Sequence, residues 1–333
     1  MILVTGGTGL VGSHLLFNLV QKEKAIRAIY RTNEKKEYVK KIFSYYTDDV
    51  DQYFSKIEWV ISDITDVFSL ESVFKGITEV YHCAALVSFD PKDYRKMRQV
   101  NIDGTANMIN FSIENNIEKF CFVSSIAAVG DSINGKPINE ENEWSDNSDN
   151  NDYSITKYGA EMEVWRGSQE GLDVVIVNPG VILGSGFWSE GSSKLFSQVY
   201  NGFKFYTEGV TGFVHVEDVV KTMVLLMESN IKNERFILVS ENKSFKDILF
   251  SIADGFNKKR PSIKSSKLLM AIIWRLDWLL TKLTGKKPLL TKNSAKSSLN
   301  KSYYTSQKIE EALNFKFAKI NSAILKICKD FTY

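Results

Sequence analysis

The sequence predicts an α/β fold in which a parallel sheet carries helices on both of its faces. Short runs rich in β-branched and aromatic residues alternate with longer helical patterns through the first two thirds of the chain, and this alternation is typical of a doubly wound sheet. The runs are apolar almost throughout, as expected of strands that are buried on both sides. The predicted strands are Ile2–Thr5, Ile26–Tyr30, Ile57–Ile61, Val80–Cys83, Phe120–Ser124 and Val174–Val177. The helical segments between them are Val11–Lys22, Lys35–Tyr46, Phe68–Phe74, Tyr94–Asn115 and Tyr153–Gln169.

The regular alternation ends after Pro179. Glycines then punctuate aromatic-rich segments, and a helix from Val216, a strand over Phe236–Val239 and a lysine-rich helical tail follow. We therefore expect residues 1–180 to form the α/β domain. Residues 181–333 are expected to form a smaller lobe that closes over a ligand and partly interleaves with the first domain.

Composition and charge indicate a globular protein that acts on a small molecule. Of the 333 residues, 44% are hydrophobic and 25% are charged, and the formal net charge is +2. So small a charge gives no reason to expect nucleic acid or an acidic membrane surface as the main partner. We expect no metal site, because the histidines and cysteines show no ligand-like spacing.

The cysteines and the apolar segments favour a cytoplasmic location. Cys83, Cys121 and Cys328 are odd in number and widely spaced, which is typical of buried thiols in a reducing compartment. The longest apolar stretch, 268–280, is interrupted by an arginine and an aspartate and is too short to span a membrane, so it predicts an amphipathic helix. A signal peptide is not expected, because the first five residues already form a strand.

A glycine-rich loop follows the first predicted strand directly. Gly6, Gly9 and Gly12 occur where the chain must turn from a strand into an apolar helix. Such a loop lets backbone N–H groups approach a pyrophosphate, which the helix N-terminus also attracts. Because the strand and helix that frame the motif are both present, it predicts a Rossmann-type dinucleotide site.

The end of the second strand discriminates between the two nicotinamide dinucleotides. An acidic residue there binds the ribose 2′-hydroxyl of NAD, whereas an arginine accommodates the 2′-phosphate of NADP. Arg31 occupies this place, with two lysines shortly after it, so NADP is favoured and NAD is the alternative. Asp63, after the third strand, is placed to accept from the adenine amino group or to cap the following helix.

A tyrosine and a lysine four residues apart form the candidate acid/base pair. Tyr153 and Lys157 lie on one face of a predicted helix. An ammonium group beside a phenol lowers its pKa, so the tyrosine can exchange a proton with a carbonyl or hydroxyl group. Upstream, a buried strand ends in Ser124 and Ser125, whose hydroxyls could steady the reacting oxygen. We choose Ser125, which immediately precedes a turn, and keep Ser124 as the alternative.

Taken in order along the chain, these motifs resemble the extended short-chain dehydrogenase/reductases, the NAD-dependent epimerase/dehydratase family. The matching segments are Thr5–Gly12, Asp63–Ile64, His82–Ala85, Asn101–Thr105, Ser124–Ser125, Tyr153–Lys157, Asn178–Gly180 and Phe213–Val219. The resemblance implies hydride transfer between a substrate carbon and nicotinamide, with Tyr153 as acid/base, Lys157 tuning it and binding ribose, and Ser125 facing the substrate. It implies a cofactor site formed by Gly6, Thr8, Gly9, Leu10, Val11, Gly12, Arg31, Asp63, Ile64, Ala84, Ala85, Asn101, Ser124, Tyr153, Lys157, Pro179 and Val181. It also implies a homodimer through the helices at Tyr94–Asn115 and Tyr153–Gln169.

Three functions stay open at this point. Family dehydratases carry an acidic pair after the catalytic serine, where this chain has Ile126–Ala128, so dehydration is not expected. This turn and Arg31 are most similar to the dihydroflavonol reductase and 3β-hydroxysteroid dehydrogenase branch, which predicts a carbonyl reductase or alcohol dehydrogenase. The aromatic residues after position 186 could line an apolar pocket, and His215 receives no catalytic role. The alternatives are an NAD-dependent sugar-nucleotide epimerase and a non-catalytic dinucleotide-binding protein.

Overall fold

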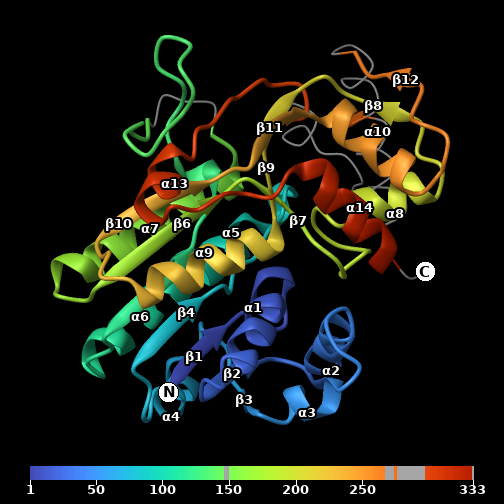
Figure 1. The fold of residues 1–333 in the computed structure, drawn as a ribbon. Helices are drawn as coiled ribbons and strands as arrows, with labels where there is room; N and C mark the ends of the chain where they lie inside the picture. Colours follow the sequence, from blue (N-terminus) through green and yellow to red (C-terminus); the bar gives the residue numbers. More distant parts are fainter. Residues whose placement is uncertain (146–149, 267–273, 276–296, 332–333) are drawn as a thin grey trace.

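The central element of the protein is a parallel sheet. The computed structural model describes residues 1–145, 150–266, 274–275 and 297–331, and within them a seven-stranded sheet runs in the order β10-β6-β5-β4-β1-β2-β3 (Figure 1). Every neighbouring pair is parallel. The strands are β1 (Ile2–Thr5), β2 (Ile26–Tyr30), β3 (Ile57–Ile61), β4 (Glu79–His82), β5 (Lys119–Val123), β6 (Val174–Pro179) and β10 (Glu234–Leu238). The predicted doubly wound α/β fold is confirmed.

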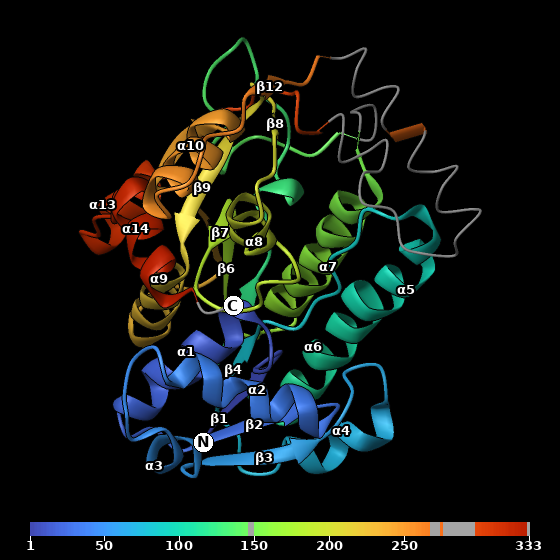
Figure 2. The ribbon, with the colours of Figure 1, turned by 90° about the vertical axis from the view of Figure 1, so that its right-hand side faces the viewer.

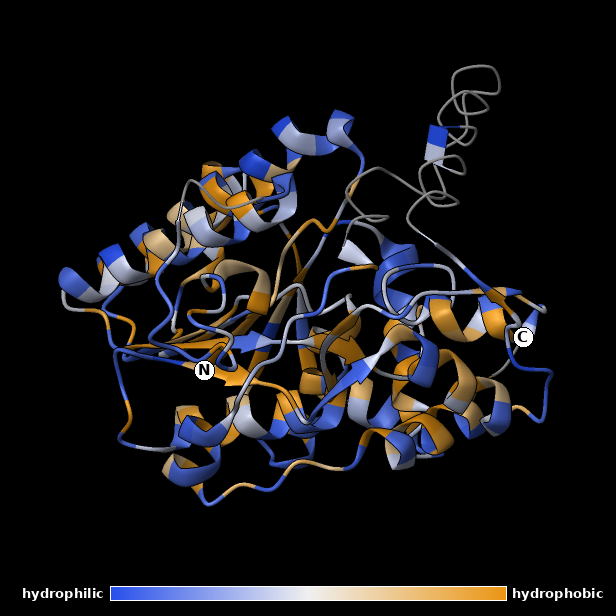
Figure 3. Ribbon diagram, turned by 90° about the horizontal axis from the view of Figure 1, so that it is seen from above, coloured by the Kyte–Doolittle hydropathy of each residue, from blue (hydrophilic) through white to orange (hydrophobic). Residues whose placement is uncertain are grey.

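Helices cover both faces of this sheet. One face carries α1 (Leu10–Gln21), α2 (Asn33–Phe43), α3 (Val50–Phe54) and α9 (Val216–Glu228). The other carries α4 (Val67–Val73), α6 (Gly104–Glu114) and α7 (Asp152–Gln169); α5 (Tyr94–Arg98) lies beside α6 and α7 in Figure 2. In the view of Figure 3, hydrophobic residues gather on the strands and inner helix surfaces, while hydrophilic residues mark the outer helix surfaces.

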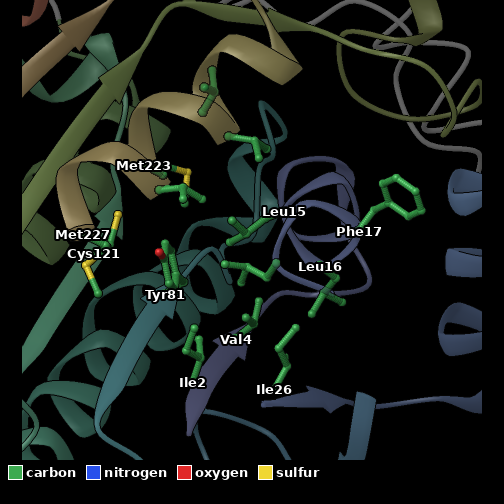
Figure 4. Close-up of a cluster of buried hydrophobic side chains, with 14 of the residues drawn as sticks. Ile2, Val4, Leu15, Leu16, Phe17, Ile26, Tyr81, Cys121, Met223 and Met227 are labelled. Carbon is green, nitrogen blue, oxygen red and sulfur yellow. The ribbon is translucent and has the colours of Figure 1, made fainter. Parts of the chain in front are cut away.

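Strand alternation divides the hydrophobic core into two layers. In β1, Val4 packs with α1 and α9 on one face, whereas Leu3 packs with α4 and α6 on the other. Figure 4 shows the first layer, in which Leu15 of α1 and Met223 of α9 belong to the same buried cluster as Val4. Burying both faces explains why the strands are apolar without alternation.

One predicted helix contains an irregular turn. The segment Tyr94–Asn115 was expected to be a single helix, but a π-helical turn over Gln99–Asp103 separates α5 from α6. Two contacts coincide with this turn. The Asn101 side chain bonds across to another segment, and a Cβ on Gly104 would lie 2.7 Å from the Ile64 side chain. Close packing and a buried amide therefore override the regular helical pattern here.

The smaller lobe begins after β6 and is built around a second small sheet. Its strands β11-β9-β7 are Glu241–Ser244, Val210–His215 and Val181–Leu183, and β8 (Phe205–Tyr206) pairs with β12 (Ile263–Lys264). The helices α8 (Lys194–Tyr200), α10 (Phe245–Gly255) and α14 (Ile320–Asp330) enclose its core, and α13 (Gln307–Leu313) packs against β10. Because α9 and β10 return to the large sheet, the chain crosses between the two parts more than once.

No helix in the described part of the chain is long and apolar enough to cross a membrane. The amphipathic helix predicted at 268–280 lies outside the described residues apart from positions 274 and 275.

Candidate active site

The glycine loop packs tightly against the end of β4. Gly6 has a left-handed backbone with φ +66°, and a Cβ there would lie 2.5 Å from the Ala84 nitrogen. A Cβ on Gly12 would overlap the Gly6 carbonyl oxygen. Both positions therefore require glycine, one for conformation and close approach and the other for close approach alone.

The same loop opens α1 as an anion-binding site. Gly9 is the N-cap of α1, and no side chain caps the first turn, so Leu10 and Val11 begin the helix with their N–H groups uncapped by a side chain. A Cβ at Gly9 would meet nothing closer than the Gly6 oxygen at 3.4 Å. Uncapped N–H groups and the helix dipole fit a pyrophosphate at this point, and Thr8 is partly exposed beside it.

Arg31 and Asp63 lie together beyond the ends of β2 and β3. Their side chains are partly exposed, with Nη1 and Oδ2 3.7 Å apart. Burial raises the pKa of Asp63, but hydrogen bonds from Thr65 and the charge of Arg31 outweigh it, so the pKa is lowered overall. Ile64 instead buries its side chain, and its carbonyl accepts from Asn107 Nδ2 at 3.0 Å.

A buried histidine holds the segment that follows β4. His82 Nδ1 lies 2.6 Å from Thr5 Oγ1, which accepts from the Ala84 N–H, and His82 Nε2 lies 3.0 Å from Thr105 Oγ1. Because Thr105 donates to the Asn101 carbonyl at 2.6 Å, the chain of bonds assigns the proton to Nε2. Burial lowers the pKa of His82 to about 3, so it stays neutral and orients Ala84 and the exposed Ala85.

Asn101 joins the same segment to α7. Its Oδ1 accepts from the Leu86 N–H at 2.7 Å, and its Nδ2 donates to the Leu86 carbonyl at 3.0 Å and to Thr156 Oγ1 at 3.1 Å. The amide is buried among these partners. Asn101 thus positions the loop after β4 against the helix that carries Tyr153 and Lys157.

Ser125, Tyr153 and Lys157 come together at the carboxyl end of β5. Ser125 caps a 3₁₀ turn over Ile126–Ala128 and hydrogen-bonds to the Tyr153 side chain. The pKa of Tyr153 is not lowered as the spacing to Lys157 predicted: burial raises it, and the influence that opposes the rise is the hydrogen bond with Ser125. Lys157 is 2% exposed, donates to the Val123 carbonyl at 2.8 Å, and has its pKa lowered to about 8 by burial.

The two serines have different surroundings. Ser124 is buried and donates to Glu161 Oε2 at 2.6 Å, so its hydroxyl is directed into the contact between β5 and α7. The Ser125 hydroxyl is directed toward Tyr153. The geometry thus favours Ser125 over Ser124 as the hydroxyl available to a substrate.

Sequence reasoning missed Glu161 and Arg235 behind this site, and it assigned no role to Asn178 of the matching segment Asn178–Gly180. Glu161, Asn178 and Arg235 form a buried hydrogen-bonded group with Ser124. Glu161 could have been found, because it follows Lys157 by four residues on the same helix face. Arg235 could not, because nothing in sequence relates a residue of β10 to α7.

At the end of β6 the chain passes from Pro179 to Val181, which begins β7. Among the described residues, Asn178 Oδ1 is buried without a hydrogen-bond partner. Apart from Asn101, Tyr153 and Lys157, which lie on helical segments, the candidate cofactor residues lie at or after the carboxyl ends of six neighbouring strands. This is where open α/β sheets bind their ligands, so fold and site together define a dinucleotide-binding enzyme of the Rossmann type.

Comparison with known proteins identifies the family. Residues 2–238 match the NAD dependent epimerase/dehydratase family, and the chain belongs to it. A putative dihydroflavonol 4-reductase from Synechocystis is 25% identical over 330 residues, covering 96% of this chain and 91% of that protein. The crystal structure of gox2253 superposes with a TM-score of 0.81 at 24% identity, covering 99% of this chain and 97% of that one.

A UDP-glucose 4-epimerase from Thermus thermophilus, solved in complex with NAD, superposes with a TM-score of 0.75 at 18% identity, over 99% and 98% of the two chains. These findings confirm the resemblance to extended short-chain dehydrogenase/reductases. The protein is an NAD(P)-dependent enzyme of that kind, in a family that contains both reductases and epimerases.

We predict that Gly6→Ala weakens dinucleotide binding by at least about tenfold and lowers the free energy of unfolding by roughly 2 kcal/mol, because it adds both a left-handed strain and a backbone clash. Gly76 is a matched control, with φ +73° and no atom within 4 Å of the position that a Cβ would take. Gly76→Ala should lower the free energy of unfolding by about 1 kcal/mol and should leave dinucleotide affinity unchanged. Urea unfolding and fluorescence titration with NADPH measure both effects; equal losses in the two variants would contradict the proposed close approach.

Proposed function

We propose that the protein is an NADP(H)-dependent oxidoreductase that interconverts a carbonyl and a secondary alcohol on a predominantly apolar substrate. The observation that carries the proposal is the assembly of Ser125, Tyr153 and Lys157 at the same edge of the sheet as the glycine loop. Membership of the family implies a nicotinamide dinucleotide as the cofactor. The three side chains would transfer the proton that accompanies hydride transfer.

In the reducing direction Tyr153 is the proton donor. Burial keeps its phenol protonated, so the hydroxyl can donate to a carbonyl oxygen as charge develops on it. Ser125 donates a second hydrogen bond to the same oxygen. When bound, the dinucleotide supplies the hydride at nicotinamide.

Lys157 has a supporting role. Its ammonium group carries three N–H donors, and the one bound to the Val123 carbonyl leaves others for a ribose hydroxyl. The resemblance to the family implies that this positive charge also stabilises the phenolate that remains after proton transfer. Uptake of one proton from solvent returns the Tyr153 phenolate to the neutral phenol and completes the cycle.

Apolar side chains beside Tyr153 support an apolar substrate. Phe89 has its ring centroid 6.1 Å from that of Tyr153 and is 40% exposed, and Val87, on the same loop, is 55% exposed. Large exposed apolar groups near a reactive phenol are suited to bind a hydrophobic ligand. The absence of a carboxylate at 126–128, directly after Ser125, disfavours water elimination.

The position of Arg31 supports NADP. It immediately follows β2, at the place where an acidic residue would recognise the ribose of NAD, and its guanidinium is about half exposed. A 2′-phosphate could replace Asp63 as its partner, with Lys35 exposed nearby.

A second candidate function is NAD-dependent epimerisation of a sugar nucleotide. It is favoured by the family match and by the structural similarity to a UDP-glucose 4-epimerase in complex with NAD. Epimerisation uses the same serine, tyrosine and lysine. It would be recognised by NAD that stays bound through purification and by turnover of a UDP-sugar without net change in the cofactor. A purely non-catalytic dinucleotide-binding protein would not need the complete trio.

We also propose that the protein is cytoplasmic and forms a homodimer. Three free cysteines, with the pKa of each thiol raised by burial, support the reducing cytoplasm. A homodimer through α6 and α7 is supported by Ile155 and Met162, large apolar residues on α7 that are each 37% exposed.

We predict that Tyr153→Phe lowers kcat for NADPH-dependent reduction of an apolar ketone by at least about 10³-fold, because it removes the proton donor. Cofactor affinity should change little. Stopped-flow and steady-state absorbance at the NADPH band measure turnover, and a circular dichroism spectrum verifies the fold. Unchanged turnover in a folded variant would refute the mechanism.

We predict that Arg31→Ser weakens NADPH binding by roughly 10- to 100-fold, because a charge-assisted bond to the 2′-phosphate is lost. NADH binding should change less than about twofold by the same reasoning. Isothermal titration with each cofactor tests this. The control is Lys75→Ser, at an exposed lysine between α4 and β4 on the opposite edge of the sheet. Equal weakening of both cofactors would count against NADP selectivity.

We predict a high-pH decline in kcat/KM. Because the pKa of Lys157 is lowered to about 8, its positive charge is present below that pH and is lost above it. The rate constant should be level between about pH 6 and 7.5 and fall up to about tenfold per unit above pH 8. A profile that stays level to pH 10 would show that the charge is not required.

A further inference from the structure

Glu161 lies buried at the contact between α7 and the strand ends. It has no solvent exposure. Its Oε2 accepts from Ser124 Oγ at 2.6 Å and from Asn178 Nδ2 at 2.8 Å, and its Oε1 faces Arg235 Nη1 at 3.2 Å. A buried carboxylate is tolerated when it is paired and hydrogen-bonded, and both oxygens of Glu161 have such partners.

These bonds hold Ser125 from two directions. Ser124, which precedes it, is bonded to Glu161, and the Ser125 carbonyl accepts from Asn178 Nδ2 at 3.0 Å. The same Asn178 amide also donates to Glu161. The end of β5 is thereby joined to α7 and β6 at the residue whose hydroxyl meets Tyr153.

Arg235 connects this group to the loop that precedes α7. Its side chain is 17% exposed, and it donates to the Glu140 carbonyl through Nε at 3.0 Å and Nη2 at 2.5 Å, and to the Asn142 carbonyl at 3.2 Å. Glu140 in turn accepts from the Ile237 N–H at 2.7 Å. The guanidinium therefore pairs with Glu161 while it holds the chain at Glu140 and Asn142.

Glu161 is also the anion that acts on Lys157. Around this ammonium, α7 contributes Glu161, and the segment at the end of β4 contributes His82 and Cys83. Burial raises the pKa of Cys83 to about 12 and lowers that of His82 to about 3, so both are neutral at physiological pH. Burial lowers the pKa of Lys157, and Glu161 is the largest influence opposing that shift.

We propose that Glu161 is a positioning residue for the reaction: it fixes the Ser124–Ser125 end of β5 against α7 and maintains the positive charge of Lys157. This inference rests on the proposed function for its catalytic consequence. The effect of the Glu161 carboxylate on the protonation of Lys157 can be measured without any substrate.

Glu161→Gln tests the two roles separately. The glutamine oxygen can still accept from Ser124 and Asn178, but the charge is lost and an N–H group faces Arg235. We expect kcat for ketone reduction to fall about 10- to 100-fold with KM within about threefold. The high-pH limb of the kcat/KM profile should move down by about one unit, the lower end of the shift caused by loss of a nearby opposite charge.

A direct titration keeps the test independent of turnover. Lysine labelled with ¹³C at Cε reports the protonation of Lys157 by NMR, with Lys157→Met to assign its signal. The Lys157 midpoint should be lower in Glu161→Gln than in the original protein. Glu163→Gln is the matched control, because Glu163 lies on the same helix but pairs with Arg166 at 2.9 Å; it should leave both midpoint and kcat unchanged.

The double variant Glu161→Gln with Arg235→Gln distinguishes positioning from general stability. Removing both charges eliminates the partly buried guanidinium that the single variant leaves without a counter-ion. The melting temperature should therefore recover partly, since the bonds from Arg235 to the Glu140 and Asn142 carbonyls are weakened at the same time. The Lys157 midpoint and kcat should stay low, because Glu161 is still absent. Recovery of kcat with the melting temperature would overturn the proposal, as would an unchanged Lys157 midpoint in the single variant.

Ser124→Ala removes one bond without changing charge. It should lower kcat by about 3- to 10-fold with the Lys157 midpoint unmoved; full activity would show that the Ser124 bond does not position Ser125. If no carbonyl compound is reduced by the original protein, the proposed function fails, while the lysine titration still decides whether Glu161 controls Lys157.

Discussion

The hydrogen bonds between α7 and the carboxyl ends of β5 and β6 hold the reactive groups in register. Lys157 bonds to the Val123 carbonyl, Glu161 to Ser124, and Asn178 to the Ser125 carbonyl. Each bond lies in an almost dry environment, where a satisfied polar group contributes rigidity and an unsatisfied one is strongly unfavourable. Tyr153 and Ser125 meet because these bonds leave the helix one way to pack on the sheet.

The same edge of the sheet carries the proposed nucleotide site, which depends on a different physical effect. There backbone groups are available to an anion, because glycines remove side chains and the start of α1 presents N–H groups without a side-chain cap. The buried chain from Thr5 through His82 to Thr105 fixes the next strand end beside it. A neutral imidazole is suited to this task, since it both accepts and donates while adding no charge next to Lys157.

Local signals were sufficient for much of this arrangement. The strands of the large sheet, the glycine loop and the Tyr153–Lys157 pair were recognisable because strand burial and helix periodicity leave direct marks on neighbouring residues. No local sequence pattern predicted the irregular turn around Asn101. It depends on a side chain that bonds to Leu86 and Thr156, each distant in sequence, and on the close packing of Gly104 against Ile64.

What the sequence by itself determined is the class of fold, the strand-to-helix turn that accepts a pyrophosphate, and the spacing that puts a tyrosine and a lysine on one helix face. These features involve residues within one or two turns of each other, so they follow from local geometry. The tertiary structure decided which of two adjacent serines faces Tyr153, and it brought Arg235, from a strand far along the chain, to the carboxylate of Glu161. Burial and pairing between distant segments are properties of the packed chain, which is why the charge on Lys157 could be assigned a cause only once the fold was known.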